Sequence, residues 1–249
     1  MIILKILSII GIMIGIIISA YLLLLIISSL LVDTKKEYEV HSRFYRWLLN
    51  SATGIAFILT RTKIHVTGLE HIPKQGRFLL VGNHRSNYDP LVTWYILRQY
   101  DLAFISKAAN FKIPFFGRLI RKCCFMTIDR ENPKNAMQTI QKATRLIEQD
   151  EVSVAVYPEG TRNTEEEMLP FHNGVFKIAQ KAKVPIVIAA IRGTECIHKN
   201  IPWRRSHVYL DILETLPTDY VTSHKTAEIG DYMRMRIQPL LHNEEENHS

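Results

Sequence analysis

The sequence predicts an α/β fold: a single domain with a mostly parallel sheet flanked by helices, plus an N-terminal membrane helix. Three observations lead to this prediction. Residues 6–32 form an uncharged apolar run. After residue 59, short apolar runs alternate with longer mixed segments, which is the pattern of a parallel sheet covered by helices. The chain also shows no internal repeat and no Pro/Gly/Ser-rich linker, so we expect one domain.

Composition differs between the start of the chain and the rest. The 249 residues are 47% hydrophobic and 22% charged, which excludes a disordered or low-complexity chain. Lys5 alone carries charge among the first 32 residues. The excess of 31 Lys and Arg over 24 Asp and Glu therefore belongs to the remainder. An apolar leader on a basic body argues against a simple soluble cytosolic protein.

Residues 1–32 are predicted to be a transmembrane or membrane-embedded segment. A spanning helix needs about 20 apolar residues, and the uncharged run is longer than that. A cleaved signal peptide has a shorter apolar region followed by a small-residue cleavage site, and Leu30-Leu31-Val32-Asp33 offers none. A re-entrant pair of helices and a helix packed in the membrane interface remain open.

The basic residues that flank this segment predict its orientation. Lys5 precedes the segment, whereas four basic residues follow it: Lys35, Lys36, Arg43 and Arg46. Because Lys and Arg concentrate on the cytoplasmic side of spanning helices, we expect a protein of the cell membrane, single-pass or embedded, whose body faces the cytoplasm.

Residues 33–63 are predicted to be an amphipathic, membrane-proximal region. Its apolar stretch, Phe44–Leu59, is short for a membrane span. A helix lying at the membrane surface would suit its polar positions, which are Arg46, Asn50, Ser51 and Thr53. An ordinary amphipathic helix packed on the body would show the same pattern, so both interpretations remain open.

A globular domain is predicted over residues 64–243, followed by an acidic, solvated tail over 244–249. The predicted strands are Ile64–Val66, Phe78–Val81, Leu102–Ile105, Phe125–Ile128, Val152–Val156, Ile186–Ile191 and His207–Ile212. The predicted helices are Pro90–Arg98, Pro133–Gln149, Gly174–Ala182 and Lys225–Gln238. Ligands of open α/β sheets bind beyond the carboxyl ends of the strands, so the residues just after these runs are the candidates for chemistry.

The first candidate cluster follows the run Phe78–Val81. His84 and Asp89 lie on a strand-to-helix turn, where the carboxylate can fix the imidazole tautomer and leave the other ring nitrogen as a general base. Asp89-Pro90 also fits a helix N-cap followed by a proline at the first helical position. The two roles are compatible, because a carboxylate has several acceptor sites.

Two further clusters follow predicted strands. The run Phe125–Arg130 ends in an acid–base pair, for which a surface ion pair is the simpler interpretation. After Val156, Gly160 permits a tight turn and Arg162 offers a bidentate fork for phosphate, although a plain turn with a solvated arginine remains open. Neither nucleophile-elbow nor phosphate-loop patterns occur, and the cysteines lack metal-ligand spacing. A histidine base that activates a substrate hydroxyl is the chemistry these residues offer, without a metal.

Taken in order, these clusters resemble the glycerolipid acyltransferase family, in particular the 1-acylglycerol-3-phosphate (lysophosphatidic acid) acyltransferases. His84 and Asp89 resemble the family's His-x4-Asp motif, and Phe125–Arg130 resembles its second motif. Pro158–Arg162 matches the family's Pro-Glu-Gly-Thr-Arg motif at every position. The resemblance extends from Ile64 to Arg192, so it makes residues 64–243 an acyltransferase domain.

The resemblance implies direct transfer of a fatty acyl group from an acyl thioester to the free hydroxyl of lysophosphatidic acid, giving phosphatidic acid. It implies His84 as the base, oriented by Asp89. The implied substrate-binding residues are Arg130, Glu159, Gly160, Thr161, Arg162 and Lys107. No cofactor is implied beyond acyl-CoA or acyl carrier protein as co-substrate; membrane lipids are partners and nucleic acid is not. The alternatives are another lysophospholipid or glycerol 3-phosphate as acceptor, and a non-catalytic membrane-binding module.

Overall fold

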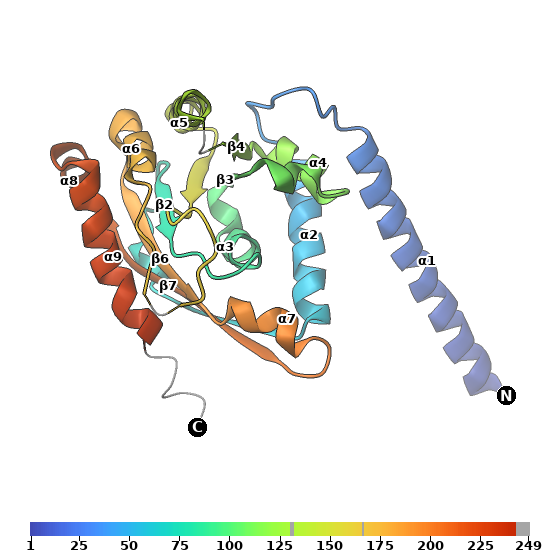
Figure 1. Ribbon diagram of the computed structural model, residues 1–249. Helices are drawn as coiled ribbons and strands as arrows, with labels where there is room; N and C mark the ends of the chain where they lie inside the picture. Colours follow the sequence, from blue (N-terminus) through green and yellow to red (C-terminus); the bar gives the residue numbers. More distant parts are fainter. Residues whose placement is uncertain (130–131, 166, 243–249) are drawn as a thin grey trace.

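A seven-stranded sheet forms the centre of the molecule (Figure 1). The structure is a computed structural model that describes residues 1–129, 132–165 and 167–242. The strands are β1 (Thr62–Thr67), β2 (Leu79–Gly82), β3 (Leu102–Lys107), β4 (Met126–Ile128), β5 (Ser153–Val156), β6 (Ile186–Arg192) and β7 (Ser206–Leu216). Their order is β1-β7-β6-β2-β5-β3-β4, and every neighbouring pair is parallel except β6 with β7. The predicted mostly parallel sheet is confirmed, and each predicted strand overlaps one of these.

The central strands are buried on both faces. All residues of β2 and β5 are buried, which is why both read as continuous apolar runs. Because successive side chains of a strand point to opposite faces, Leu79 and Val81 belong to one hydrophobic cluster, and Phe78 and Leu80 to the other. The sheet is therefore the middle layer between two cores.

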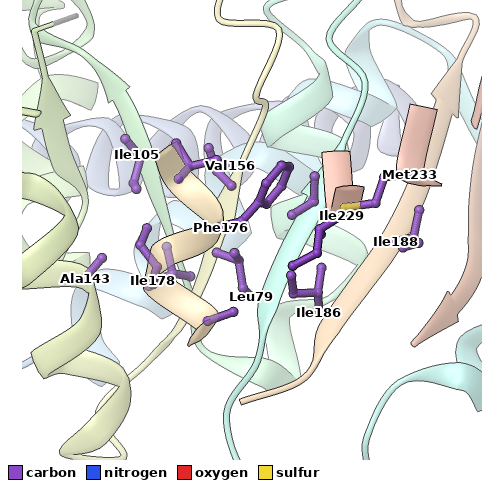
Figure 2. Packing of buried hydrophobic residues seen from close by; sticks show 14 of the residues in the cluster. Leu79, Ile105, Ala143, Val156, Phe176, Ile178, Ile186, Ile188, Ile229 and Met233 are labelled. Carbon is purple, nitrogen blue, oxygen red and sulfur yellow. The ribbon is translucent and has the colours of Figure 1, made fainter. Parts of the chain in front are cut away.

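Helices cover both faces of the sheet. One face packs against α5 (Pro133–Glu148), α6 (Lys177–Ala182), α8 (Thr218–Ser223) and α9 (Thr226–His242). Figure 2 shows Phe176, which directly precedes α6, and Met233 of α9 in the same cluster as Leu79. The other face packs against α2 (Arg43–Leu59), α3 (Asp89–Ile96) and α7 (Ile197–Asn200). Five of these helices, α2, α3, α5, α6 and α9, overlap predicted segments, whereas the short α7 and α8, and α4 (Phe116–Leu119), were not predicted.

The N-terminal helix α1 (Ile2–Leu30) extends away from the rest of the molecule (Figure 1). Residues 1–20 are all exposed. Only its C-terminal part touches the body: the Tyr45 hydroxyl donates to the carbonyl of Ser28 at 2.9 Å, and the Tyr21 and Ser51 hydroxyls lie 2.8 Å apart. Among the described helices, α1 is the one long and apolar enough to cross a membrane.

Helix α2 packs on the body with polar side chains on its inner face. Leu48, Leu49 and Phe57 are buried against the sheet, but so are Arg46 and Thr53. The Arg46 guanidinium donates to the carbonyls of Leu102, Asp101 and Cys123 at 3.0, 3.0 and 3.4 Å. Of the two interpretations left open, Arg46 and Thr53 therefore fit a helix packed on the body. Backbone carbonyls accept from both terminal nitrogens of the buried Arg46 guanidinium, and the Thr53 hydroxyl donates to the carbonyl of Leu49.

Candidate active site

A buried asparagine fixes the point where the chain leaves β2. The side-chain amide of Asn83 donates to the carbonyl of Ile191, and its side-chain oxygen accepts from the N–H of Ile191, both at 2.8 Å. Through these two bonds, the Asn83 side chain connects β2 to the backbone of β6 just beyond the paired residues of the two strands. His84, the next residue, therefore starts from a fixed position at the carboxyl edge of the sheet.

His84 and Asp89 contact each other directly. Nδ1 of His84 lies 2.7 Å from Oδ2 of Asp89, a side chain with no exposed surface. The same oxygen accepts from the N–H groups of Arg85 and Ser86 at 2.6 and 2.7 Å, and the Thr194 hydroxyl donates to Oδ1. Because an ionised carboxylate only accepts hydrogen bonds, this arrangement favours the proton of His84 on Nδ1 and leaves Nε2 able to accept another.

Asp89 does not cap helix α3. The helix begins at Asp89 itself, and its N-cap residue is Tyr88, which makes no side-chain capping bond. The predicted N-cap role is therefore wrong. The carboxylate instead turns back to the backbone donors of the preceding turn, and Pro90 lies in the first helical turn, where its missing N–H breaks no helical bond.

The His84 ring is held between Asp89 and an aromatic ring. It stacks on Tyr157, with ring centroids 4.7 Å apart and an interplanar angle of 11°. The Tyr157 hydroxyl lies 3.1 Å from that of Thr93. Burial, and next the negative charge of Asp89, raise the pKa of Tyr157 well above its usual value. Tyr157 is therefore a neutral platform that fixes the plane of the imidazole.

Glu159 braces the loop that follows β5. Its Oε1 accepts from the N–H of His84 at 2.9 Å, and its Oε2 accepts from the N–H of Leu169 at 3.1 Å. The side chain is buried, and this burial raises its pKa. Gly160 has φ = 78°, a conformation that favours glycine. Both carboxylate oxygens therefore bind the protein's own backbone beside the candidate base.

The candidate phosphate-binding cations lie at different distances from this centre. Arg162 is exposed, and the next residue, Asn163, donates its N–H to the carbonyl of His84 at 2.7 Å. The Arg162 and Thr161 backbone is thus held beside the base. Lys107 ends β3, which is two strands from β2, or about 10 Å at ordinary strand spacing. Arg130 lies outside the described residues.

Several residues that the motifs do not single out complete the site. Thr194 follows β6 and reaches Asp89 across 105 positions of sequence. The buried Arg85 forms an ion pair with Glu195, Nε to Oε1 at 3.0 Å, and donates to the carbonyl of Thr164 at 3.3 Å. Arg85 thereby ties the loop after β5 to the loop after β6. In the sequence, the one feature that Arg85, Thr194 and Glu195 have in common is a position just after a predicted strand.

The three cysteines differ in burial. Cys123 and Cys124 are buried, and burial raises the pKa of each thiol to about 12. Cys196 is partly buried. Within the described part of the chain, no group of His, Cys, Asp or Glu side chains is arranged to hold a metal ion. The acid–base chemistry that the described residues offer comes from the contact between His84 and Asp89.

Known proteins are similar to this chain in sequence and in fold. The family described as Acyltransferase matches residues 63–192. The 1-acyl-sn-glycerol-3-phosphate acyltransferase of Haemophilus influenzae is 30% identical over 168 residues, which cover 66% of this chain and 70% of that protein. The enzyme of the same name from Escherichia coli is 34% identical over 156 residues, covering 63% and 62%.

A solved structure extends the likeness to the whole fold. It is the crystal structure of the 1-acyl-sn-glycerophosphate (LPA) acyltransferase PlsC from Thermotoga maritima, with a TM-score of 0.68. The two chains are 24% identical, and the match covers 91% of this chain and 89% of that one. The matched family region contains β2 to β6, β1 from its second residue, and the His84–Asp89 pair, whereas Thr194 lies just beyond it. The chain belongs to the acyltransferase family, and within it resembles the 1-acyl-sn-glycerol-3-phosphate acyltransferases.

Proposed function

We propose that the protein transfers a fatty acyl group from an acyl thioester to the free hydroxyl of lysophosphatidic acid, giving phosphatidic acid. The observation that carries the proposal is the contact between His84 and the buried Asp89 at the carboxyl edge of the sheet. Relatives named for this reaction at 30% and 34% identity support the choice of acceptor.

In the proposed reaction, Nε2 of His84 takes the proton of the acceptor hydroxyl. The oxygen attacks the thioester carbonyl carbon, so that a C–O bond forms, the C–S bond breaks, and the thiolate leaves with the proton from the imidazolium. Asp89 stabilises the imidazolium charge while it exists. A positioned base of this kind accelerates a reaction by about 10²–10⁴-fold. No acyl-enzyme is needed.

The acceptor's phosphate would meet the loop after β5. Arg162 is exposed and makes no hydrogen bond or ion pair with any residue that the structure describes, so its fork is available for a bidentate phosphate contact. Arg130 is the second proposed phosphate contact and Lys107 a third. Glu159, Gly160 and Thr161 would shape the glycerol end of the site.

The apolar helix α1 fits an acceptor that resides in a bilayer. We propose that α1 holds the protein in the cell membrane with the acyltransferase domain on the cytoplasmic side. Acyl-CoA or acyl carrier protein would deliver the thioester from there, without a further cofactor. The basic body, in a chain of net charge +7, would favour anionic lipids.

An acceptor panel tests the proposal. Full-length protein in detergent is given acyl-CoA with lysophosphatidic acid, other lysophospholipids or glycerol 3-phosphate, and the products are identified by mass spectrometry. Lysophosphatidic acid should give the highest kcat/KM, with phosphatidic acid as product. A higher kcat/KM with another acceptor would reassign the substrate. Liposome binding without turnover of any acceptor or donor would leave only a membrane-binding module.

A further inference from the structure

An unusually exposed tryptophan lies on the loop between α7 and β7. Trp203 is 84% exposed, and its neighbour Ile201 is also exposed. The Arg61 guanidinium donates to the carbonyl of Trp203 at 3.3 Å. This bond ties the loop to the C-terminal end of α2, where Ile58 and Leu59 are 77% and 71% exposed. Two segments far apart in sequence, each with exposed apolar side chains, are thus placed next to each other.

Cations surround this surface without any acidic neighbour in sequence. The exposed basic residues are Arg61, Lys199, Arg204 and Arg205. Residues 43–69 and 196–210 contain no Asp or Glu. Each Lys or Arg close to an anionic lipid surface contributes about 1 kcal/mol of attraction, and Trp is enriched at the membrane–water interface. Charge and aromatic content both match a lipid headgroup region.

The surface lies at the same edge of the sheet as the candidate active site. β7 runs antiparallel to β6, with Arg192 opposite Tyr209, so β7 begins where β6 ends. β1 starts beside β7, with Thr62 opposite Ser206. The connection from β6 to β7 that carries α7 and Trp203 also contains Thr194, whose hydroxyl donates to Asp89. The apolar surface and His84 therefore share one side of the molecule.

Helix α1 points the same way. In Figure 1 its N-terminal end lies toward the end of the molecule that holds α7 and the C-terminal end of α2. A bilayer that contains the exposed part of α1 would therefore lie toward this end of the molecule, where α7 leads into the segment that carries Trp203. Any partner other than lipid that bound the apolar surface would have to lie on the same side of the molecule as the apolar helix α1.

We propose that Ile58, Leu59, Arg61, Ile201 and Trp203–Arg205 form a second membrane contact, the edge patch, which binds the surface of an anionic bilayer. Trp203 and the aliphatic side chains enter the interface, and the arginines bind lipid phosphates. One consequence rests on the proposed function: the contact holds the His84 edge against the headgroups, where a lysolipid hydroxyl lies. The contact itself does not depend on that function.

Quenching of Trp203 by brominated lipid tests the edge patch. The full chain is reconstituted in vesicles of equal parts phosphatidylcholine and phosphatidylglycerol, with or without bromine near the top of the acyl chains. The chain has three tryptophans, so the emission of Trp203 is the difference between wild type and Trp203→Phe. This difference should fall in brominated vesicles. If it is the same in both kinds of vesicle, Trp203 does not contact lipid and the proposal is overturned.

Charge reversal tests the recognition of anionic lipid. Arg204→Glu with Arg205→Glu should lower the quenching of Trp203 in these vesicles. The matched control is Lys181→Glu with Lys183→Glu, two exposed lysines that precede β6 at the opposite edge of the sheet, and it should leave the quenching unchanged. Equal quenching in both double variants would overturn the role of the arginines. Since the readout is fluorescence, failure of acyl transfer in the acceptor panel would not alter it.

Discussion

At the scale of single residues, Asp89 has two tasks that one substitution can separate. Its carboxylate holds the turn His84–Ser86 and would stabilise an imidazolium. In Asp89→Asn, the remaining side-chain oxygen can still accept from the backbone N–H groups of Arg85 and Ser86. The new side-chain NH₂ group can donate to the Thr194 hydroxyl. The fold should survive without the charge. We expect kcat to fall about 10²–10⁴-fold with little change in KM, measured by thiol release.

Thermal unfolding of Asp89→Asn provides the control. A midpoint close to that of the wild type, together with the fall in kcat, would assign the loss to the charge. A variant that turns over at the wild-type rate would exclude Asp89 as the partner of a charged His84.

The buried carboxyl group of Glu159 should make the stability of the protein depend on pH. Burial raises its folded-state pKa above 4.5, so the folded protein binds its proton more tightly than the unfolded chain does. The contribution of Glu159 to wild-type stability should therefore decline as pH rises from about 4.5 through the folded-state pKa. Glu159→Gln lacks this titration, so the stability of the wild type minus that of the variant should be larger at pH 4.5 than at pH 7. Urea denaturation of both proteins measures it, and a difference that grows with pH would contradict it.

Only part of this site could be predicted from the sequence. His84 and Asp89 are close in the chain, and the turn between them brings them into contact. Thr194 lies just after β6, 105 positions from Asp89, and a single threonine after a strand has no recognisable pattern. Only the pairing of β6 beside β2 brings it to Asp89.

At the scale of elements, hydrophobic runs predicted the strands because the central strands are buried on both faces. The same reasoning could not decide whether the polar positions of α2 face the membrane surface or the body. Arg46 faces inward because carbonyls at the start of β3 and at Cys123 are there to accept its protons. Hydropathy carries no information about such partners. Short helices such as α4 and α7, with four residues each, barely complete one turn and show no periodicity.

Arg46 should therefore be essential for docking α2. Arg46→Met leaves three carbonyls without their donor and removes the contact with the Trp94 ring. We expect the free energy of unfolding to fall by about 2–4 kcal/mol, measured by urea denaturation in detergent. Arg43→Met changes an exposed arginine of the same helix and should have little effect. Equal stability of the two variants would contradict the assignment of Arg46 to this contact.

At the scale of the whole molecule, α1 and the body are separable. Residues 1–20 are exposed, whereas Ser28 and Ser29 are buried against the body. Deletion of residues 2–20 should leave the unfolding midpoint of the body within a few degrees of the wild type, while the fraction that sediments with membranes falls. Unchanged sedimentation would mean that α1 is not the main anchor.

The account as a whole depends on proton transfer at His84. The most direct test compares wild type with His84→Ala for thiol release from acyl-CoA in detergent, with and without lysophosphatidic acid, after thermal unfolding has shown that both are folded. We predict release that requires the acceptor in the wild type and falls by about 10²-fold or more in His84→Ala. Acceptor-dependent release at the wild-type rate in His84→Ala would contradict the account.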